Sequence, residues 1–308
     1  MNTESKTRLA LAQLSLLGLS VGDAFGQGFF APAWYAKRLI EHRTLPMKPW
    51  DFTDDTMMSI GIVEVLSQYE EINQDALAQT FARHYIEEPN RGYGGMAHFI
   101  LRSISEGMHW RSVSQKVFDG MGSMGNGGAM RVAPLGAYFF DDIEKVIHQA
   151  TLSAEVTHAH PEGQAGAIAV ALAAAWACRT RDDLQANSGY DLLEFVFSHT
   201  PDSETRSKLN AALSLPLNYS IETAVSALGN GSQLLASDTV AFTIWCVARH
   251  LESYVEALWH TVSALGDRDT TCAIVGGILS LIQGEAGIPD DWKNEIQIQI
   301  QNYGSFYK

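Results

Sequence analysis

The sequence predicts an all-α protein that forms one compact domain over residues 1–308. No stretch shows sustained alternation of apolar and polar residues, or the enrichment in β-branched residues that is typical of a sheet. Helix start and stop signals divide the chain instead into helical segments, and no linker-like tract separates them. With 308 residues, 46% hydrophobic and 18% charged, the chain can bury a large core.

The predicted helices of the first half follow these start and stop signals. An apolar helix is expected over residues 6–20, ending at the glycine-containing segment 21–28, whose glycines permit close backbone approach or positive φ. Prolines at positions 32, 46 and 49 predict an irregular loop over residues 29–52. Further helices are expected over residues 53–69, over 74–86, from the glycine-rich turn 90–95 through Ser105, and over 110–118.

The second half contains an Ala-rich segment and several shorter helices. The longest apolar run, Ala165 to Cys178, is too short to span a bilayer and indicates a core helix. Outer helices are expected near residues 191–198, 204–213 and 221–228, and another helix over 252–264. Between them, Asp238 and Thr239 are predicted to cap a helix.

Charge and cysteine content restrict the class of protein. The formal net charge of −14 argues against unassisted binding of nucleic acid or an anionic membrane, but it allows one phosphorylated small ligand. The three scattered cysteines Cys178, Cys246 and Cys272 fit a reducing compartment, and each is expected to be buried. The first residues show no cleavage-site pattern, so a cytoplasmic location is expected.

Two acidic motifs precede apolar helical runs. They are Thr53-Asp54-Asp55-Thr56 and Asp267-Arg268-Asp269-Thr270. Either motif alone is compatible with plain helix capping. A cap needs one oxygen, however, whereas each motif supplies two carboxylates, which repel each other unless a proton or cation intervenes. Carboxylates and hydroxyls are ligands that suit Mg²⁺ or Mn²⁺, so we expect the two motifs to meet and to hold metal ions.

Two further segments carry candidate ligand groups. The glycine-rich turn Gly125-Asn126-Gly127-Gly128 is compatible with a phosphate cradle or with a tight turn between helices. The nearby Arg131 is a phosphate partner or a structural residue, and we favour the second. His158 and His160 are metal ligands or a hydrogen-bonding pair in a loop, and the absence of a third ligand favours the pair.

Five motifs in order resemble the ADP-ribosylglycohydrolases, from about residue 10 to residue 290. This family includes the bacterial dinitrogenase-reductase-activating glycohydrolase and the animal ADP-ribosylarginine and ADP-ribosylserine hydrolases. The motifs are Gly22-Asp23-Ala24-Phe25-Gly26, Thr53-Asp54-Asp55-Thr56, Gly125-Asn126-Gly127-Gly128-Ala129-Met130-Arg131, Thr157-His158-Ala159-His160-Pro161 and Asp267-Arg268-Asp269-Thr270.

The resemblance implies an orthogonal helical bundle with a central cleft for two Mg²⁺ ions, with Mn²⁺ as an alternative. It implies a hydrolase that cleaves the bond between ADP-ribose and an acceptor. For such an enzyme we prefer ADP-ribosylarginine on a protein as substrate, which the acidic surface would favour, and we expect Asp54 or Asp55 to handle the proton. His158 would contact the ribose, and Gly92 and Gly94 would line the cleft. The implied metal ligands are Thr53, Asp54, Asp55, Asp267, Asp269 and Thr270, and the implied diphosphate site is Gly125, Asn126, Gly127 and Gly128.

Two positions depart from the family pattern. Phe30 stands where some members have Glu, and Arg268 stands where a small residue is often found, pointing outward or contacting substrate. Other acceptors stay open, namely ADP-ribosylserine, O-acetyl-ADP-ribose or a nucleic-acid adduct. Two other classes also stay open: an ADP-ribose-binding module without turnover, and a metal-stabilised structural protein. The expected partner is an ADP-ribosylated protein or a small molecule that contains ADP-ribose.

Overall fold

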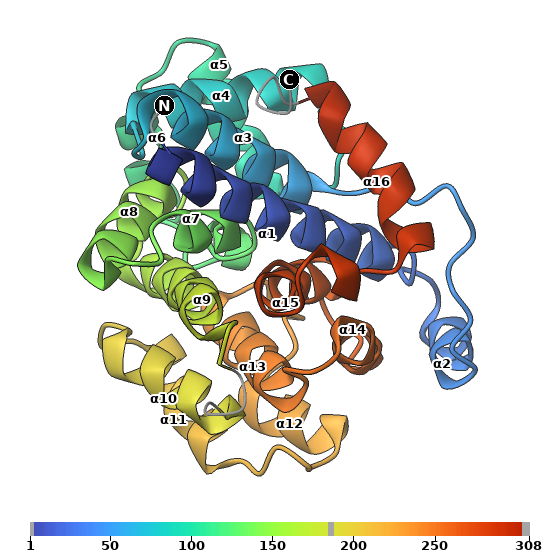
Figure 1. Ribbon diagram of the computed structural model, residues 1–308. Coiled ribbons are helices and arrows are strands. Elements are labelled where there is room, and N and C mark those ends of the chain that lie inside the picture. The colour runs from blue at the N-terminus through green and yellow to red at the C-terminus, as the bar shows by residue number, and fades with distance from the viewer. Residues whose placement is uncertain (1–2, 184–187, 304–308) are drawn as a thin grey trace.

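The computed structural model describes residues 3–183 and 188–303, and within them the chain forms α-helices and short 3₁₀ helices without a β-strand (Figure 1). The all-α prediction is confirmed. The helices are α1 (Thr3–Gln27), α2 (Ala33–Glu41), α3 (Asp54–Tyr69), α4 (Gln74–Glu87), α5 (Gly95–Ser105), α6 (Trp110–Lys116), η1 (Asn126–Gly128), α7 (Ala133–Tyr138), α8 (Ile143–Glu155), α9 (Pro161–Thr180), α10 (Gly189–His199), α11 (Glu204–Ser214), α12 (Ile221–Leu228), α13 (Ala236–Arg249), α14 (Tyr254–Ser263), α15 (Arg268–Gln283), η3 (Glu285–Gly287) and α16 (Asp290–Tyr303).

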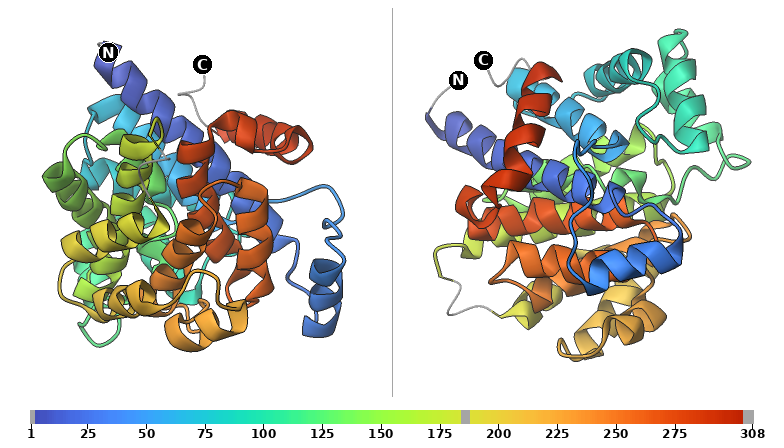
Figure 2. Two further views of the ribbon diagram at one scale, coloured as in Figure 1. Left: turned by 60° about the horizontal axis from the view of Figure 1, so that its bottom comes forward. Right: turned by 90° about the vertical axis from the view of Figure 1, so that its right-hand side faces the viewer.

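The middle of the bundle is an antiparallel pair formed by α1 and α15 (Figures 1 and 2). Glycines bring the two backbones into contact. A Cβ atom at Gly22 would lie 2.2 Å from the carbonyl oxygen of Cys272, and one at Gly26 would lie 2.1 Å from that of Arg268. The predicted helix end at residue 20 is therefore wrong, because the glycines of segment 21–28 permit close helix packing and α1 continues to Gln27.

The length and apolar character of α1 do not by themselves make it a membrane helix. Residues 4–27 have the length and mean hydropathy, 1.4, of a membrane span, but 72% of the most apolar window is buried inside the protein. Its polar groups also bond within the bundle: the Ser15 hydroxyl donates to the Gly277 carbonyl, and the Tyr254 hydroxyl donates to the Gly18 carbonyl. In this structure α1 is a core helix.

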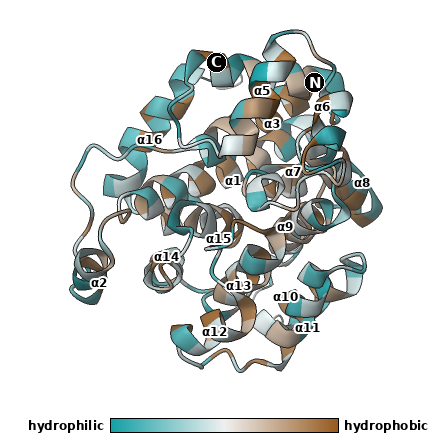
Figure 3. Ribbon diagram, turned by 180° about the vertical axis from the view of Figure 1, so that it is seen from behind, coloured by the Kyte–Doolittle hydropathy of each residue, from teal (hydrophilic) through white to brown (hydrophobic). Residues whose placement is uncertain are grey.

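Two local predictions need correction, and two helices are not predicted from the sequence. The predicted loop 29–52 contains α2, which buries only Ala36 and lies at the outside of the bundle. Figure 3 shows both hydrophobic and hydrophilic residues on α2 and mainly hydrophilic residues on α16. Helix α13 begins at Ala236, before the predicted cap, because the Asp238 carboxylate accepts the Gln233 N–H of the preceding turn instead. No helix is predicted from the sequence where α8 and α16 lie.

The other elements agree with the sequence. The predicted helices of α3 to α6, α9 to α12 and α14 are present, with ends shifted by a few residues at most. In α9, every residue from Ala165 to Cys178 is buried, as expected for the core helix. The three cysteines are free and buried, which confirms the interpretation that they act as small core residues.

Candidate active site

The first turns of α3 and α15 meet in space. The hydroxyl of Thr270 lies 3.5 Å from Oδ2 of Asp55, although the two residues are 215 positions apart in the sequence. Both line a cleft of about 590 Å³ together with Asp54, Asp267 and Asp269. The predicted convergence of the two acidic motifs is therefore present in the structure.

Asp23 on α1 fixes the start of α3. Its fully buried carboxylate accepts hydrogen bonds from the backbone N–H and the hydroxyl of Thr56, at 3.1 and 2.6 Å, and the same two kinds of bond from Thr53. Burial raises the pKa of Asp23 to about 6, and the four bonds oppose that rise. Sequence analysis assigned no role to Asp23, although it lies in the first family motif.

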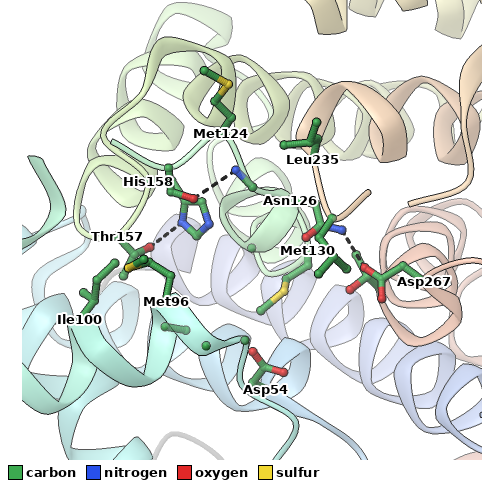
Figure 4. A pocket seen from close by; sticks show the side chains of 18 of the residues that line it. Asp54, Met96, Ile100, Met124, Asn126, Met130, Thr157, His158, Leu235 and Asp267 are labelled. Carbon is green, nitrogen blue, oxygen red and sulfur yellow. Dashed lines mark hydrogen bonds between the residues drawn. The ribbon is translucent and has the colours of Figure 1, made fainter. Parts of the chain in front are cut away.

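Capping accounts for part of the first motif and not for the second. The Thr53 hydroxyl caps α3 by accepting the Asp55 N–H. At the start of α15, Asp267 makes no such cap bond. Its Oδ2 instead accepts a hydrogen bond of 2.7 Å from the side-chain amide of Asn126 (Figure 4). The same amide also donates to the Thr239 hydroxyl. Asn126, predicted as a phosphate contact, thus orients a carboxylate of the cleft.

The acids of the cleft are crowded and poorly solvated. Burial, followed by the charge of Asp23, raises the pKa of Asp54 to about 8 and that of Asp55 well above its ordinary value. Burial, followed by the charge of Asp267, raises the pKa of Asp269 well above its ordinary value. Such shifts mean that the carboxylates are costly to ionise together unless a cation joins them.

The protein supplies little positive charge to balance these acids. No Lys or Arg is among the described residues that line the cleft. The fully buried Arg131 lies behind it, where its guanidinium donates to the Ser153 carbonyl and stacks on the Phe81 ring, 4.6 Å from the ring centroid. Burial lowers the pKa of Arg131 to about 9, and the charge of Asp54 opposes this. The structural interpretation of Arg131 agrees with these contacts.

The donor set fits hard divalent cations. Oδ1 of Asp55 is buried without a hydrogen-bond partner, as expected of an oxygen kept free for a ligand. Carboxylates and the Thr270 hydroxyl surround the same space, and these are the oxygen donors that Mg²⁺ and Mn²⁺ prefer. Among residues 3–183 and 188–303, however, no three His, Cys, Asp or Glu side chains are already grouped as a closed metal site.

The glycine turn packs against His158. A Cβ atom at Gly127 would lie 2.8 Å from Cε1 of His158, and one at Gly125 would lie 3.3 Å from its Nε2. The other ring nitrogen, Nδ1, is 2.8 Å from the Thr157 hydroxyl (Figure 4). Burial lowers the pKa of His158 to about 3, so the imidazole is neutral. A neutral imidazole can donate one hydrogen bond and accept another, so it can bind a hydroxyl of a ligand.

The remaining predicted residues divide into those in the cleft and those behind it. Gly92, with φ of +90°, and Gly94 line the cleft. Thr53 and Gly128 are not among the lining residues, and Gly128 is buried, where a Cβ atom would lie 3.5 Å from the carbonyl oxygen of Gly163. His160 caps α9 by accepting the Glu162 N–H, so the two histidines belong to a hydrogen-bonded loop, as favoured from the sequence.

The apolar part of the cleft is not predicted from the sequence. Apart from the carboxylates and the glycine turn, the wall is built largely of methionine and other apolar side chains from α3, α5, the segments that flank the glycine turn and the segment before α13 (Figure 4). These residues are Met58, Met96, Ile100, Phe118, Met121, Met124, Met130, Leu234 and Leu235. The closely spaced Met121, Met124 and Met130 around the glycine turn were the signal that could have found it. An adaptable apolar wall suits a flat organic group.

Phe30 and Arg268 lie beside the cleft without lining it. The Arg268 guanidinium donates to the Phe29 carbonyl and stacks on the Phe30 ring, 4.9 Å from the ring centroid. Arg268 is thus directed toward the segment after α1, while Asp267 and Asp269 on either side of it face the cleft.

Comparison with known proteins agrees with this geometry. The family profile of the ADP-ribosylglycohydrolases matches residues 4–304. The chain belongs to this family. Human and mouse ADP-ribosylhydrolase ARH3 are each 30% identical over 275 residues, covering 80% of this chain and 74% and 73% of those proteins. An uncharacterised protein of Archaeoglobus fulgidus is 29% identical over 287 residues, covering 90% of this chain and 88% of that protein.

A solved structure has the same fold. It is described as an ADP-ribosylglycohydrolase-related protein complex, and it superposes with a TM-score of 0.65 over 97% of this chain and 98% of that one, at 23% identity. As a member of the family, the protein is an ADP-ribosylglycohydrolase, a hydrolase of linkages to ADP-ribose.

Proposed function

We propose that this ADP-ribosylglycohydrolase depends on divalent cations and releases ADP-ribose from a modified protein, with ADP-ribosylarginine as the preferred linkage. The observation that carries the proposal is the charge of the cleft: four aspartates line it and no Lys or Arg among the described residues does. A dianionic diphosphate would be repelled from such a cleft unless cations were bound there first. Two Mg²⁺ ions, or Mn²⁺ in their place, would provide that charge.

The residues at the two helix starts would hold the ions. Asp54, Asp55, Asp269 and Thr270 present oxygens to the cleft, Asp267 is oriented by Asn126, and Thr53 is held by Asp23. When bound, such ions supply Lewis-acid stabilisation and make a coordinated water more acidic. Both Asp54 and Asp55 line the cleft at the start of α3, so we assign proton transfer to Asp54, with Asp55 as the alternative.

The rest of the cleft would bind ADP-ribose. In the glycine turn the N–H groups of Gly125 and Asn126 already donate to the Ser123 hydroxyl and the Leu234 carbonyl, so the N–H groups of Gly127 and Gly128 would contact the diphosphate. The neutral His158 can hydrogen-bond a ribose hydroxyl. An aspartate carboxylate close to the reacting sugar carbon would stabilise an oxocarbenium-like transition state. The bond broken is the one between that carbon and the acceptor, and water supplies the hydroxyl of the released ADP-ribose.

One assay tests the proposal and its alternatives. The purified protein is given arginine-linked and serine-linked ADP-ribosyl peptides with Mg²⁺, with Mn²⁺ and with a chelator, and free ADP-ribose is measured. We expect metal-dependent release, faster from the arginine-linked peptide. Faster release from the serine-linked peptide would change the assigned acceptor from arginine to serine and would leave the proposed metal dependence unaffected.

Two negative results would point to other functions. Tight binding of ADP-ribose without release from any peptide would indicate a binding module. The presence of Phe30 where some family members have Glu is compatible with this alternative. Failure to bind ADP-ribose in calorimetry would instead favour a metal-stabilised structural protein. The cytoplasmic location and the absence of membrane and nucleic-acid partners remain predictions from the sequence.

A further inference from the structure

Arg268 is a cation with unused bonding capacity next to an anionic cleft. Its guanidinium makes no ion pair with any described residue, and its Nε atom is buried without a hydrogen-bond partner. The other contacts that hold it are the Phe29 carbonyl and the Phe30 ring. A guanidinium presents five donors, of which the Nε donor is buried and one donor of a terminal nitrogen is used by the Phe29 carbonyl, so the other donors of the terminal nitrogens are those available to a ligand.

Phe30 gives this cation an exposed aromatic partner. The Phe30 side chain is 49% exposed, unlike the neighbouring Phe29, which is fully buried. A half-exposed ring in contact with a guanidinium is a surface on which another chain can pack. We call Phe30 and Arg268 the acceptor rim.

The position of the rim relates it to the acceptor. Arg268 lies between Asp267 and Asp269, which both line the cleft. The scissile bond must reach the carboxylates for reaction, so the acceptor attached to that bond comes close to the first turn of α15, from which the Arg268 side chain projects.

We propose that the acceptor rim recognises a carboxylate next to the modified residue, so that the enzyme prefers acceptor segments with Asp or Glu beside the ADP-ribosylated position. This inference rests on the proposed function. A guanidinium binds carboxylate, like phosphate, in a two-bond geometry, and carboxylate is the anion that unmodified protein side chains supply. A basic neighbour would be repelled by the same group. The net charge of −14 would by itself favour cationic partners, whereas the acceptor rim would locally favour an anionic one.

The test compares three peptides with the same ADP-ribosyl linkage and with acidic, neutral or basic flanking residues. We expect kcat/KM to be about three- to fivefold higher for the acidic than for the neutral peptide, the range of one exposed ion pair, and the advantage to shrink at high salt. Peptide affinities are measured in parallel by fluorescence anisotropy.

Arg268→Met should abolish this advantage, and Phe30→Leu should reduce it while leaving the buried core intact. The matched control is Arg179→Met, which removes the same charge from the exposed far end of α9, about 27 Å along the helix from its first turn. Mn²⁺ titration of each variant shows whether the adjacent carboxylates still bind metal.

Three results would overturn the inference: equal kcat/KM for all wild-type peptides, an acidic preference that persists in Arg268→Met, or an equal loss of preference in Arg179→Met. Absence of ADP-ribose release from every peptide would instead contradict the proposed function. In that case the peptide affinities still test the acceptor rim. We expect the wild type to bind the acidic peptide more tightly than the neutral one, and Arg268→Met to lose this difference.

Discussion

The carboxylate of Asp23 accepts hydrogen bonds from both the backbone N–H and the hydroxyl of Thr53, each at 2.9 Å. This contact joins the central helix α1 to the first turn of α3, where the acids of the first motif begin. A buried residue that is not part of the cleft lining therefore determines where Asp54 and Asp55 lie.

Asp23→Asn should weaken metal binding by about tenfold or more, as loss of an outer hydrogen-bond partner of metal ligands commonly does. The carboxamide offers one acceptor oxygen in place of two, and its NH₂ group faces backbone donors. Calorimetric titration with Mn²⁺ measures the change. Asp51→Asn, an exposed acid two residues before Thr53, is the control, and equal affinities in the two variants would argue against a positioning role for Asp23.

Gly127→Ala should lower the affinity for ADP-ribose, because the added methyl group would displace the His158 ring from its position 2.8 Å away. The fold should persist, since the ring can turn toward the open cleft. Isothermal titration with ADP-ribose in the presence of Mg²⁺ measures the effect. In Gly95→Ala the new methyl group meets no atom within 4 Å, so this variant shows what an added methyl does without that contact. Similar affinities for the two variants would count against the role of His158.

Metal binding should strengthen as pH rises. Because burial raises the pKa of Asp54 from 3.8 to about 8, the folded metal-free protein holds a proton that the unfolded chain releases. Its stability therefore falls as pH rises through this window, and a cation that replaces the proton restores it. We expect Mg²⁺ to raise the melting temperature more at about pH 8 than at about pH 6. An equal or larger increase at the lower pH would contradict the assignment.

Particular residues show what the sequence could predict. The helix at Thr53 and the acids of both motifs could be found because a cap, paired carboxylates and an apolar run are local signals. Gly22 and Gly26 lie in the segment where the sequence predicts a helix end, but in the structure they bring α1 against α15. A glycine that allows two helices to touch cannot be distinguished from one that ends a helix by its local sequence.

Contacts between distant segments could not be predicted from local sequence patterns. The bond from Asn126 to Asp267 joins residues 141 positions apart, and nothing near Asn126 distinguishes a carboxylate partner from a phosphate. Likewise, the stacking of Arg268 on Phe30 brings together two departures from the family pattern that lie near opposite ends of the chain. Only the packing of α1 against α15 makes them neighbours.

The central claim is that the starts of α3 and α15 act as one divalent-cation site required for hydrolysis. The most direct measurement is Mn²⁺ titration, together with ADP-ribose release, for the wild type, Asp55→Asn, Asp269→Asn and the control Asp51→Asn. We expect two ions per chain and full activity in the wild type and the control, and loss of bound metal and of activity in each of the other two variants. Unchanged metal binding and unchanged release in both Asp55→Asn and Asp269→Asn would contradict the claim.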